Sequence, residues 1–188
     1  MTGLRARRAR WAALGLCVSV GCGIGFWRHA TALASQDTAL SLTTSSFRAN
    51  GDIPARFTCE GADASPALSW GEPPSGTNTF ALVMSDPDAP GGNFVHWVIY
   101  DLPASTRSLP EGVAQGPDAA GGHQGPNSFE KTGYNGPCPP PGKPHRYFFR
   151  LWALDSAPDQ QQASAQTLES AARGHILARG ELMGRFRR

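Results

Sequence analysis

Apolar residues recur along several stretches of the chain in the manner of β-strands. Residues 79–84 form a short apolar run that stops at an Asp-Pro turn, which predicts a buried strand. Residues 95–102 and 145–154 each place large apolar groups on both faces, as strands at the centre of a sandwich do. A further strand is expected near residues 40–47, so the pattern predicts a protein built mainly of β-structure.

Alternation along a strand assigns its side chains to two faces. In the strand predicted over residues 145–154, His145 and Tyr147 share one face. In the strand over residues 95–102, the same rule puts His96 on a face with Val98 and Tyr100. It puts three other residues on the opposite face: Val95, Trp97 and Ile99.

The end of the chain carries a helical pattern. Residues 167–187 contain six apolar residues that would form one stripe on a helix: Leu168, Ala172, Ile176, Leu182, Met183 and Phe186. Thr167 can cap the first turn, and arginines cluster near the end, where the helix dipole favours them. We therefore expect a C-terminal helix that packs on a sheet. The Gly- and Pro-rich residues 111–143 are instead expected to form a long functional loop.

Composition and charge refine this picture. The chain has 188 residues, enough for one domain with a core, and its 22 glycines and 16 prolines are typical of short strands joined by turns. The net charge of +2 is uneven, because residues 1–34 hold five arginines and no acid. The remainder has 12 basic against 15 acidic residues. This mildly acidic body lacks the basic surface that a nucleic-acid-binding protein needs.

The first 34 residues have the organisation of a secretory leader. A basic stretch at residues 5–10 precedes an apolar stretch at 11–27, and small residues follow at positions 32 and 34, which a signal peptidase reads. This order predicts a signal peptide cleaved before Ser35. The alternative is an uncleaved anchor through residues 11–27, which is short for a membrane-spanning helix. Either way, the body is expected in an exported compartment, periplasmic or extracellular, or anchored at the inner membrane and facing that compartment.

Beyond the leader, residues 35–46 are expected to be a Ser/Thr-rich linker and residues 47–188 a single domain. Two of the four cysteines lie in the leader, which leaves Cys59 and Cys138 in the domain. An oxidising compartment would allow them to pair, and two separate buried thiols are the alternative. No Cys or His spacing typical of a zinc site occurs.

Polar residues with useful chemistry accompany the Pro-rich turns. Five side chains supply two carboxylates, two imidazoles and a phenol: Asp86, Asp88, His96, His145 and Tyr147. Imidazoles and a phenol beside backbone N–H groups suit a phosphate-like anion, and the carboxylates would orient the imidazoles or receive a cationic head group. The plainer alternatives are aspartates that shape turns and histidines that are satisfied core residues.

The two central motifs are Ser-Asp-Pro-Asp-Ala-Pro at residues 85–90 and His-Arg-Tyr at 145–147. With them, the chain resembles the phosphatidylethanolamine-binding protein family, in particular its bacterial branch, often labelled Raf kinase inhibitor-like. The matching segments extend from about residue 40 to the C-terminus: 57–61, 65–66, 85–90, 94–97, 127–129, 132–134, 136–140 and 145–147.

The resemblance implies a mainly β fold, an antiparallel β-sandwich with a few peripheral helices, and a pocket for phosphate-type head groups at one end of it. Matched to the family motifs, the implied ligand-binding residues are Asp86, His96, His145 and Tyr147, and the implied rim residues are Asp88, Pro90, Gly136 and Pro139. Both domain cysteines also lie in family motifs, which favours a Cys59–Cys138 disulfide.

These observations predict an exported, non-catalytic binding module that needs no cofactor. It would hold a phosphate-like anion or a phospholipid head group and act through a protein partner; inhibition of a protease or kinase is one form this could take. The alternative is a hydrolase or lyase that uses His96 or His145 as general base, oriented by Asp86. The chain has no Gly-x-Ser-x-Gly nucleophile elbow. A metal site at the aspartates and histidines lacks local ligand spacing.

Overall fold

The computed structural model describes residues 38–158 and 162–188, and the predicted leader at residues 1–34 lies outside them. The described residues contain α1 (Ala165–Ala172), a short 3-10 helix η1 (Ala55–Phe57) and ten strands. The strands are β1 (Thr38–Ala39), β2 (Leu42–Thr43), β3 (Leu68–Trp70), β4 (Thr79–Asp86), β5 (Phe94–Pro103), β6 (Ser108–Leu109), β7 (Asp118–Ala119), β8 (Gly122–Gln124), β9 (His145–Leu154) and β10 (Ile176–Phe186). Among these residues, no helix has the length and apolarity needed to cross a membrane.

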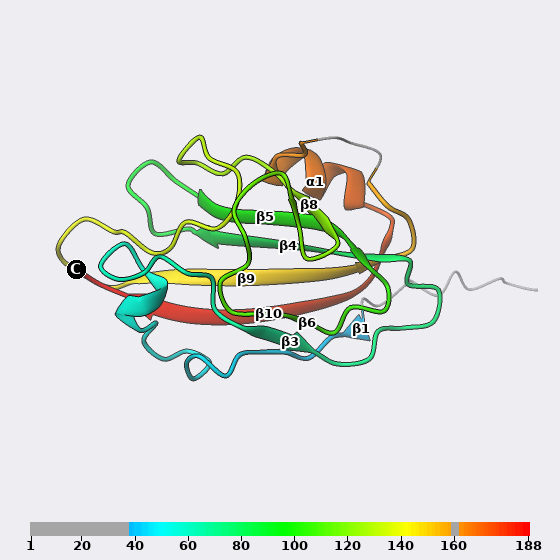
Figure 1. Ribbon diagram of the computed structural model, residues 1–188, viewed down its shortest axis with the longest axis horizontal. Coiled ribbons are helices and arrows are strands. Elements are labelled where there is room, and N and C mark those ends of the chain that lie inside the picture. The colour runs from blue at the N-terminus through cyan, green and yellow to red at the C-terminus, as the bar shows by residue number, and fades with distance from the viewer. Residues whose placement is uncertain (1–37, 159–161) are drawn as a thin grey trace, which may run out of the picture. The chain divides into compact units, whose positions relative to one another are not determined.

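The strands form two open sheets (Figure 1). The large sheet has seven strands in the order β1-β10-β9-β4-β5-β8-β7, and the small one has three in the order β2-β3-β6. Nearly all pairs are antiparallel, but β1 runs parallel to β10, with Thr38 opposite Ala178. The mainly β prediction is confirmed. The large sheet is nevertheless mixed, so the fold is not a purely antiparallel sandwich.

Apolar layers cover both faces of the large sheet. One layer joins it to the small sheet and includes Leu68 and Trp70 of β3 together with Leu82 and Phe149. The other layer lies under α1, whose Leu168 is fully buried. Every residue of β4 is buried, because alternate side chains serve the two layers. This explains why the stretch at residues 79–84 is continuously apolar.

The strands predicted from the apolar pattern are present. Residues 145–154 coincide with β9, and the stretches at 79–84 and 95–102 lie within β4 and β5. The strand expected near residues 40–47 is limited to Leu42–Thr43. The segment 111–143 is irregular apart from the short strands β7 and β8.

A β-bulge at His96 changes the predicted faces of β5. Val95 and Trp97 pair with consecutive residues of β4, so His96 is an extra residue in its strand. Trp97 consequently packs in the layer that contains Tyr147, whereas Val95 packs in the layer that contains Val98. The ring of His96 lies 5.2 Å from that of Tyr147. The predicted grouping of His96 with Val98 is therefore wrong, because the bulge shifts the alternation by one residue.

The predicted C-terminal helix over residues 167–187 is wrong for most of its length. The helix α1 is capped by Ser164, whose side chain accepts from the Thr167 N–H, and it ends at Ala172. Gly174 follows with a φ of 84°, a left-handed conformation typical of a helix end. The chain then enters β10, where buried residues alternate: Ala178, Gly180, Leu182, Gly184 and Phe186. The supposed helical stripe combined residues of two elements.

Candidate functional site

A cavity of about 160 Å³ lies where three strands of the large sheet meet. Because β4 is antiparallel to both β5 and β9, its end at Asp86 adjoins the starts of the other two strands at Phe94 and His145. The cavity is lined by Asp86, Ala89, Pro90, Phe94, His96, Phe129, Cys138, Pro139, Pro140, His145 and Tyr147. Topology thus brings together polar residues that are far apart in sequence.

Asp86 holds the imidazole of His145 in place. Its Oδ2 accepts a hydrogen bond of 2.8 Å from His145 Nδ1, and both side chains are buried. Its Oδ1 accepts from the Asp88 N–H at 2.8 Å, which shapes the turn after β4. One carboxylate therefore fixes both the turn and the ring. With Nδ1 occupied, Nε2 is the nitrogen of His145 that a ligand can reach.

Asp88 secures the same turn to β9 through Arg146. Its carboxylate accepts from the Arg146 backbone N–H at 3.0 Å and from the guanidinium at 2.9 and 2.7 Å. The hydrogen bonds from the Arg146 side chain are the main reason why the pKa of Asp88 falls to about 2. Adjacent residues of β9, His145 and Arg146, are thus each bound by one aspartate of the Asp-Pro-Asp turn.

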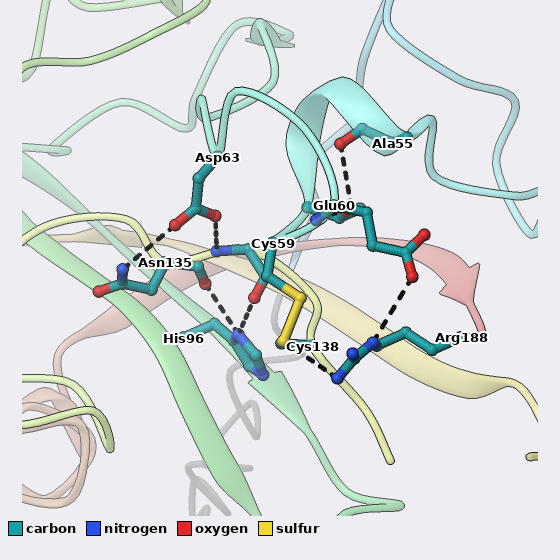
Figure 2. Close-up of a disulfide and its surroundings, with 10 residues drawn as sticks. Ala55, Cys59, Glu60, Asp63, His96, Asn135, Cys138 and Arg188 are labelled. Atoms are coloured by element: carbon teal, nitrogen blue, oxygen red, sulfur yellow. Dashed lines mark hydrogen bonds and ion pairs between the residues drawn. A yellow bond between two sulfur atoms is a disulfide. The ribbon is translucent and has the colours of Figure 1, made fainter. Parts of the chain in front are cut away.

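His96 is held by two backbone carbonyls (Figure 2). Its Nδ1 lies 2.8 Å from the oxygen of Asn135 and 3.1 Å from that of Gly136. Carbonyl oxygens only accept, so Nδ1 carries the proton and Nε2 of the neutral ring is unprotonated. Burial lowers the pKa of His96 below its usual value, although the two carbonyls and the Asp86 carboxylate oppose this shift. The ring is therefore neutral near pH 7 in the free protein.

Tyr147 and two phenylalanines complete the walls. The Tyr147 hydroxyl is buried and has no hydrogen-bond partner within the described part of the chain. Burial raises the pKa of Tyr147, and the Asp86 carboxylate, whose charge and closeness to the hydroxyl both favour the protonated form, raises it further. The hydroxyl therefore stays protonated, although its geometry toward Asp86 falls short of a hydrogen bond. Phe94 and Phe129 pack edge to face with centroids 4.9 Å apart, and Phe129 lies 5.4 Å from the His96 ring.

A disulfide supports the side of the pocket formed by residues 135–140. Cys59 and Cys138 are bonded, with Cα atoms 5.4 Å apart, which confirms the predicted pair. The Cys59 N–H also donates to the Pro137 carbonyl at 3.2 Å. Gly136 leaves no room for a side chain, since a Cβ there would overlap the Phe57 carbonyl oxygen. The carbonyls that hold His96 are thus fixed by close packing on both sides.

The structure brings all four predicted ligand-binding residues, Asp86, His96, His145 and Tyr147, to this cavity. Of the predicted rim residues, Pro90 and Pro139 line it, whereas Asp88 and Gly136 lie behind the lining and hold it in place. Sequence reasoning missed the walls Phe94 and Phe129, although both lie in recognised motifs. It also missed the carbonyl of Asn135, for which a sequence carries no signal, because every residue has one.

Besides the Asp86 carboxylate, which is occupied by His145, the pocket offers two ring nitrogens and one hydroxyl among apolar residues. Its described lining has no serine or threonine. It also has no free thiol, because its one cysteine, Cys138, is in the disulfide. Across residues 38–158 and 162–188, no group of three His, Cys, Asp or Glu side chains is arranged to hold a metal ion. The volume is below the roughly 300–1,000 Å³ of pockets for drug-sized ligands. A small polar group fits this space better than a large ligand.

Comparison with known proteins matches the chain to one family and to relatives of similar length. A model of the family described as phosphatidylethanolamine-binding protein matches residues 43–187. A relative named UPF0098 protein from Aquifex aeolicus is 44% identical over 146 residues, covering 76% of this chain and 85% of its own. The protein of that name from Methanothermobacter thermautotrophicus is 44% identical over 154 residues, covering 79% of this chain and 99% of its own.

Two solved structures share the fold. One is described as a putative phosphatidylethanolamine-binding protein homolog, CT736, from Chlamydia trachomatis. It has a TM-score of 0.73 at 34% identity and covers 81% of this chain and 99% of its own. The other is YbcL of Escherichia coli, described as a new member of the mammalian PEBP family, that is, the phosphatidylethanolamine-binding proteins. It has a TM-score of 0.72 at 30% identity and covers 80% of this chain and 99% of its own.

Proposed function

The chain belongs to the phosphatidylethanolamine-binding protein family, and from this we propose that it is an exported, non-catalytic binding protein for a small phosphate-type anion. The ligand would be free, or the head group of a phospholipid, and its binding would modulate a protein partner. The observation that carries the proposal is that polar groups of the pocket are held on one side and leave atoms available to a ligand. Two histidines are held by Nδ1, and a buried tyrosine hydroxyl has no partner among the described residues.

The geometry suits an oxyanion for a specific reason. When His145 is protonated at Nε2, it can donate to a ligand oxygen while Nδ1 still donates to Asp86, whose carboxylate balances the added charge. Tyr147 supplies a second donor. His96 accepts from a protonated ligand oxygen while it is neutral, and donates once it is protonated. Three oxygens of a phosphate group could thus each find a partner in the pocket.

Binding of inorganic phosphate and of O-phosphoethanolamine, measured by calorimetry, tests the proposal. In His96→Asn and His145→Asn, the new amide can replace the Nδ1 donor but not Nε2, so the supporting hydrogen bonds are kept. We expect each variant to lose about 1.5–3 kcal/mol of binding free energy, roughly ten- to hundredfold in affinity, for one lost charge-assisted bond.

The matched control is His123→Asn. His123 is exposed and paired with Asp118 at 2.7 Å, as His145 is with Asp86, but it lies outside the pocket. Its variant should bind both probes normally. Tighter binding of O-phosphoethanolamine than of phosphate would identify a head group as the ligand. Unchanged affinity in folded His96→Asn and His145→Asn would mean that these residues are core histidines, and the proposal would fail.

The hydrolase or lyase alternative is tested with the same proteins. The Asp86–His145 pair has the orientation of a general base. The described pocket lining, however, has no hydroxyl or thiol nucleophile besides the tyrosine. A panel of phosphoesters should therefore be bound without turnover. Turnover that disappears in His145→Asn would contradict the non-catalytic function.

A further inference from the structure

The disulfide lies at the mouth of the pocket rather than in the core. Cys59 and Cys138 are both exposed, and Cys138 is one of the residues that line the cavity. Exposed disulfides are the ones that thiols can attack, whereas purely structural ones are usually buried. Figure 2 shows the bond beside the residues that hold His96.

The charges around the two sulfurs differ. The Arg188 guanidinium approaches Cys138 Sγ at 3.9 Å and also pairs with Glu60 at 3.5 Å. Glu60 is the residue directly after Cys59. A nearby cation stabilises a thiolate, and a nearby carboxylate destabilises one. If the bond is broken, negative charge is therefore better placed on Cys138 than on Cys59.

We propose that this disulfide is a thiol–disulfide exchange site for low-molecular-weight thiols. The thiolate of the small thiol attacks Cys59 Sγ, forms a mixed disulfide with Cys59, and releases Cys138 as a thiolate beside Arg188. A second molecule of the thiol then attacks that mixed disulfide, which leaves Cys59 reduced and the small thiol oxidised to its own disulfide. Each step exchanges one S–S bond for another, and no further oxidant or reductant is required.

Two hydrogen bonds join the same two segments beside the disulfide. Tyr134 donates its hydroxyl to the Phe57 carbonyl at 2.7 Å, and the Gly136 N–H donates to Asp63 at 2.7 Å. Both contacts join the chain near Cys59 to the chain near Cys138. We therefore expect the exchanged protein to remain folded, so that exchange is reversible.

Exchange would also change the charge of the pocket wall, and the expected effect on ligand affinity rests on the proposed anion-binding function. A released Cys138 thiolate would place a negative charge in the wall of a cavity proposed to hold an anion. Phosphate affinity should consequently fall on exchange. The single variants separate this effect from loss of the bond, because Cys59→Ser leaves a free Cys138 and Cys138→Ser leaves a free Cys59.

The experiment uses the folded protein with 2-mercaptoethanol, a neutral thiol. After short times, free thiols are trapped with iodoacetamide and the sites are mapped by mass spectrometry. We expect the mercaptoethanol adduct on Cys59 and the trapped thiol on Cys138. Arg188→Gln should slow the exchange about two- to fivefold and Glu60→Gln should accelerate it, as for one partly screened charge. Arg107→Gln, which breaks a surface pair with Glu72, is the matched control and should have no effect.

An adduct found mainly on Cys138, or a bond that reacts only after the protein is unfolded, would overturn the proposal. Weaker phosphate binding in Cys59→Ser than in Cys138→Ser would support the effect on the pocket, and equal affinities would refute it. If the oxidised protein binds no phosphate at all, the proposed function fails. The site and rate of exchange would still be tested by the mass-spectrometric result.

Discussion

Tyr147 combines a fully buried ring with a hydroxyl that has no partner among the described residues. A buried, unsatisfied polar group costs stability unless a ligand or water uses it. We expect Tyr147→Phe to leave the free energy of unfolding unchanged or to raise it by up to about 1 kcal/mol. The same change should weaken phosphate binding by about 0.5–1.5 kcal/mol, the typical value of one hydrogen bond.

Urea unfolding measures the free energy of unfolding of Tyr147→Phe, and calorimetry measures its affinity for phosphate. Tyr134→Phe is the control, because its hydroxyl donates to the Phe57 carbonyl at 2.7 Å and is satisfied inside the protein. That variant should lose stability. If Tyr147→Phe is destabilised like the control and binds phosphate normally, the Tyr147 hydroxyl has a structural role only.

His96 makes stability depend on pH in a defined direction. Because burial lowers its pKa in the folded protein below the usual value of 6.5, the folded state binds fewer protons than the unfolded state in mildly acidic solution. The stability contributed by neutral His96 is fully present above pH 6.5 and is lost as the pH falls through the folded pKa. The slope from this one group is at most about 1.4 kcal/mol per pH unit.

Unfolding measured at pH 7 and pH 5 tests this dependence. His96→Asn, which does not titrate, should lose less stability than the wild type over this interval. Sulfate, whose charge does not change in this range, should protect the wild type more at pH 5, because a bound anion favours the protonated ring. An identical pH dependence in the variant would contradict the assignment of the shift to His96.

At the scale of elements, the segment 135–140 is closely constrained at Gly136. Gly136 accepts from His96 through its carbonyl, donates its N–H to Asp63, and has no space for a Cβ. We expect Gly136→Ala to destabilise the protein by about 1–3 kcal/mol, as overpacking of a well-packed region does. Phosphate affinity should also fall, because the carbonyls behind His96 must move.

Gly112→Ala and Gly142→Ala are not suitable controls, because both glycines adopt positive φ. Gly91→Ala is a better match, since Gly91 is exposed and a Cβ added there would have no neighbour within 4 Å among the described residues. Thermal unfolding should show a lower melting temperature for Gly136→Ala only. Equal melting temperatures for the two variants would show that the segment can adapt.

The local sequence pattern predicted the central strands, and the motifs predicted which residues converge at the cavity. The bounds of β9 equal the predicted range of residues 145–154, because this stretch places large apolar side chains on both faces of a strand. Asp86, His96, His145 and Tyr147 were assigned because they lie in motifs whose spacing identifies the family. The disulfide was assigned on the same motifs.

What the sequence did not predict depends on partners distant along the chain. The bulge at His96 is a property of the pairing between β4 and β5, and no residue type in β5 predicts it. The segment of β10 has a helical pattern of apolar residues, because its strand alternation is carried partly by Gly180 and Gly184, which do not count as apolar. These glycines are required by packing: a Cβ on Gly184 would lie 2.6 Å from Ile53 Cγ1.

At the scale of the whole molecule, residues 1–34 are basic and apolar, whereas the rest of the chain is mildly acidic. We expect the mature protein to begin at Ser35 and to be found outside the cytoplasm, because residues 5–34 follow the order of a signal peptide. N-terminal sequencing of protein from fractionated cells measures this directly. An intact Met1 on an exported protein would support the membrane anchor, and an intact Met1 on cytosolic protein would contradict export.

The central claim is that the Nε2 atoms of His96 and His145 bind an anion. Long-range ¹H–¹⁵N NMR reports the protonation of each ring nitrogen, so a titration with inorganic phosphate tests the claim most directly. In the free protein, His96 should be neutral with its proton on Nδ1. Added phosphate should shift the Nε2 signals of His96 and His145 together, with one dissociation constant, and leave the exposed His123 and His175 unchanged. Signals of His96 and His145 that do not move, or that move no more than those of His123 and His175, would contradict it.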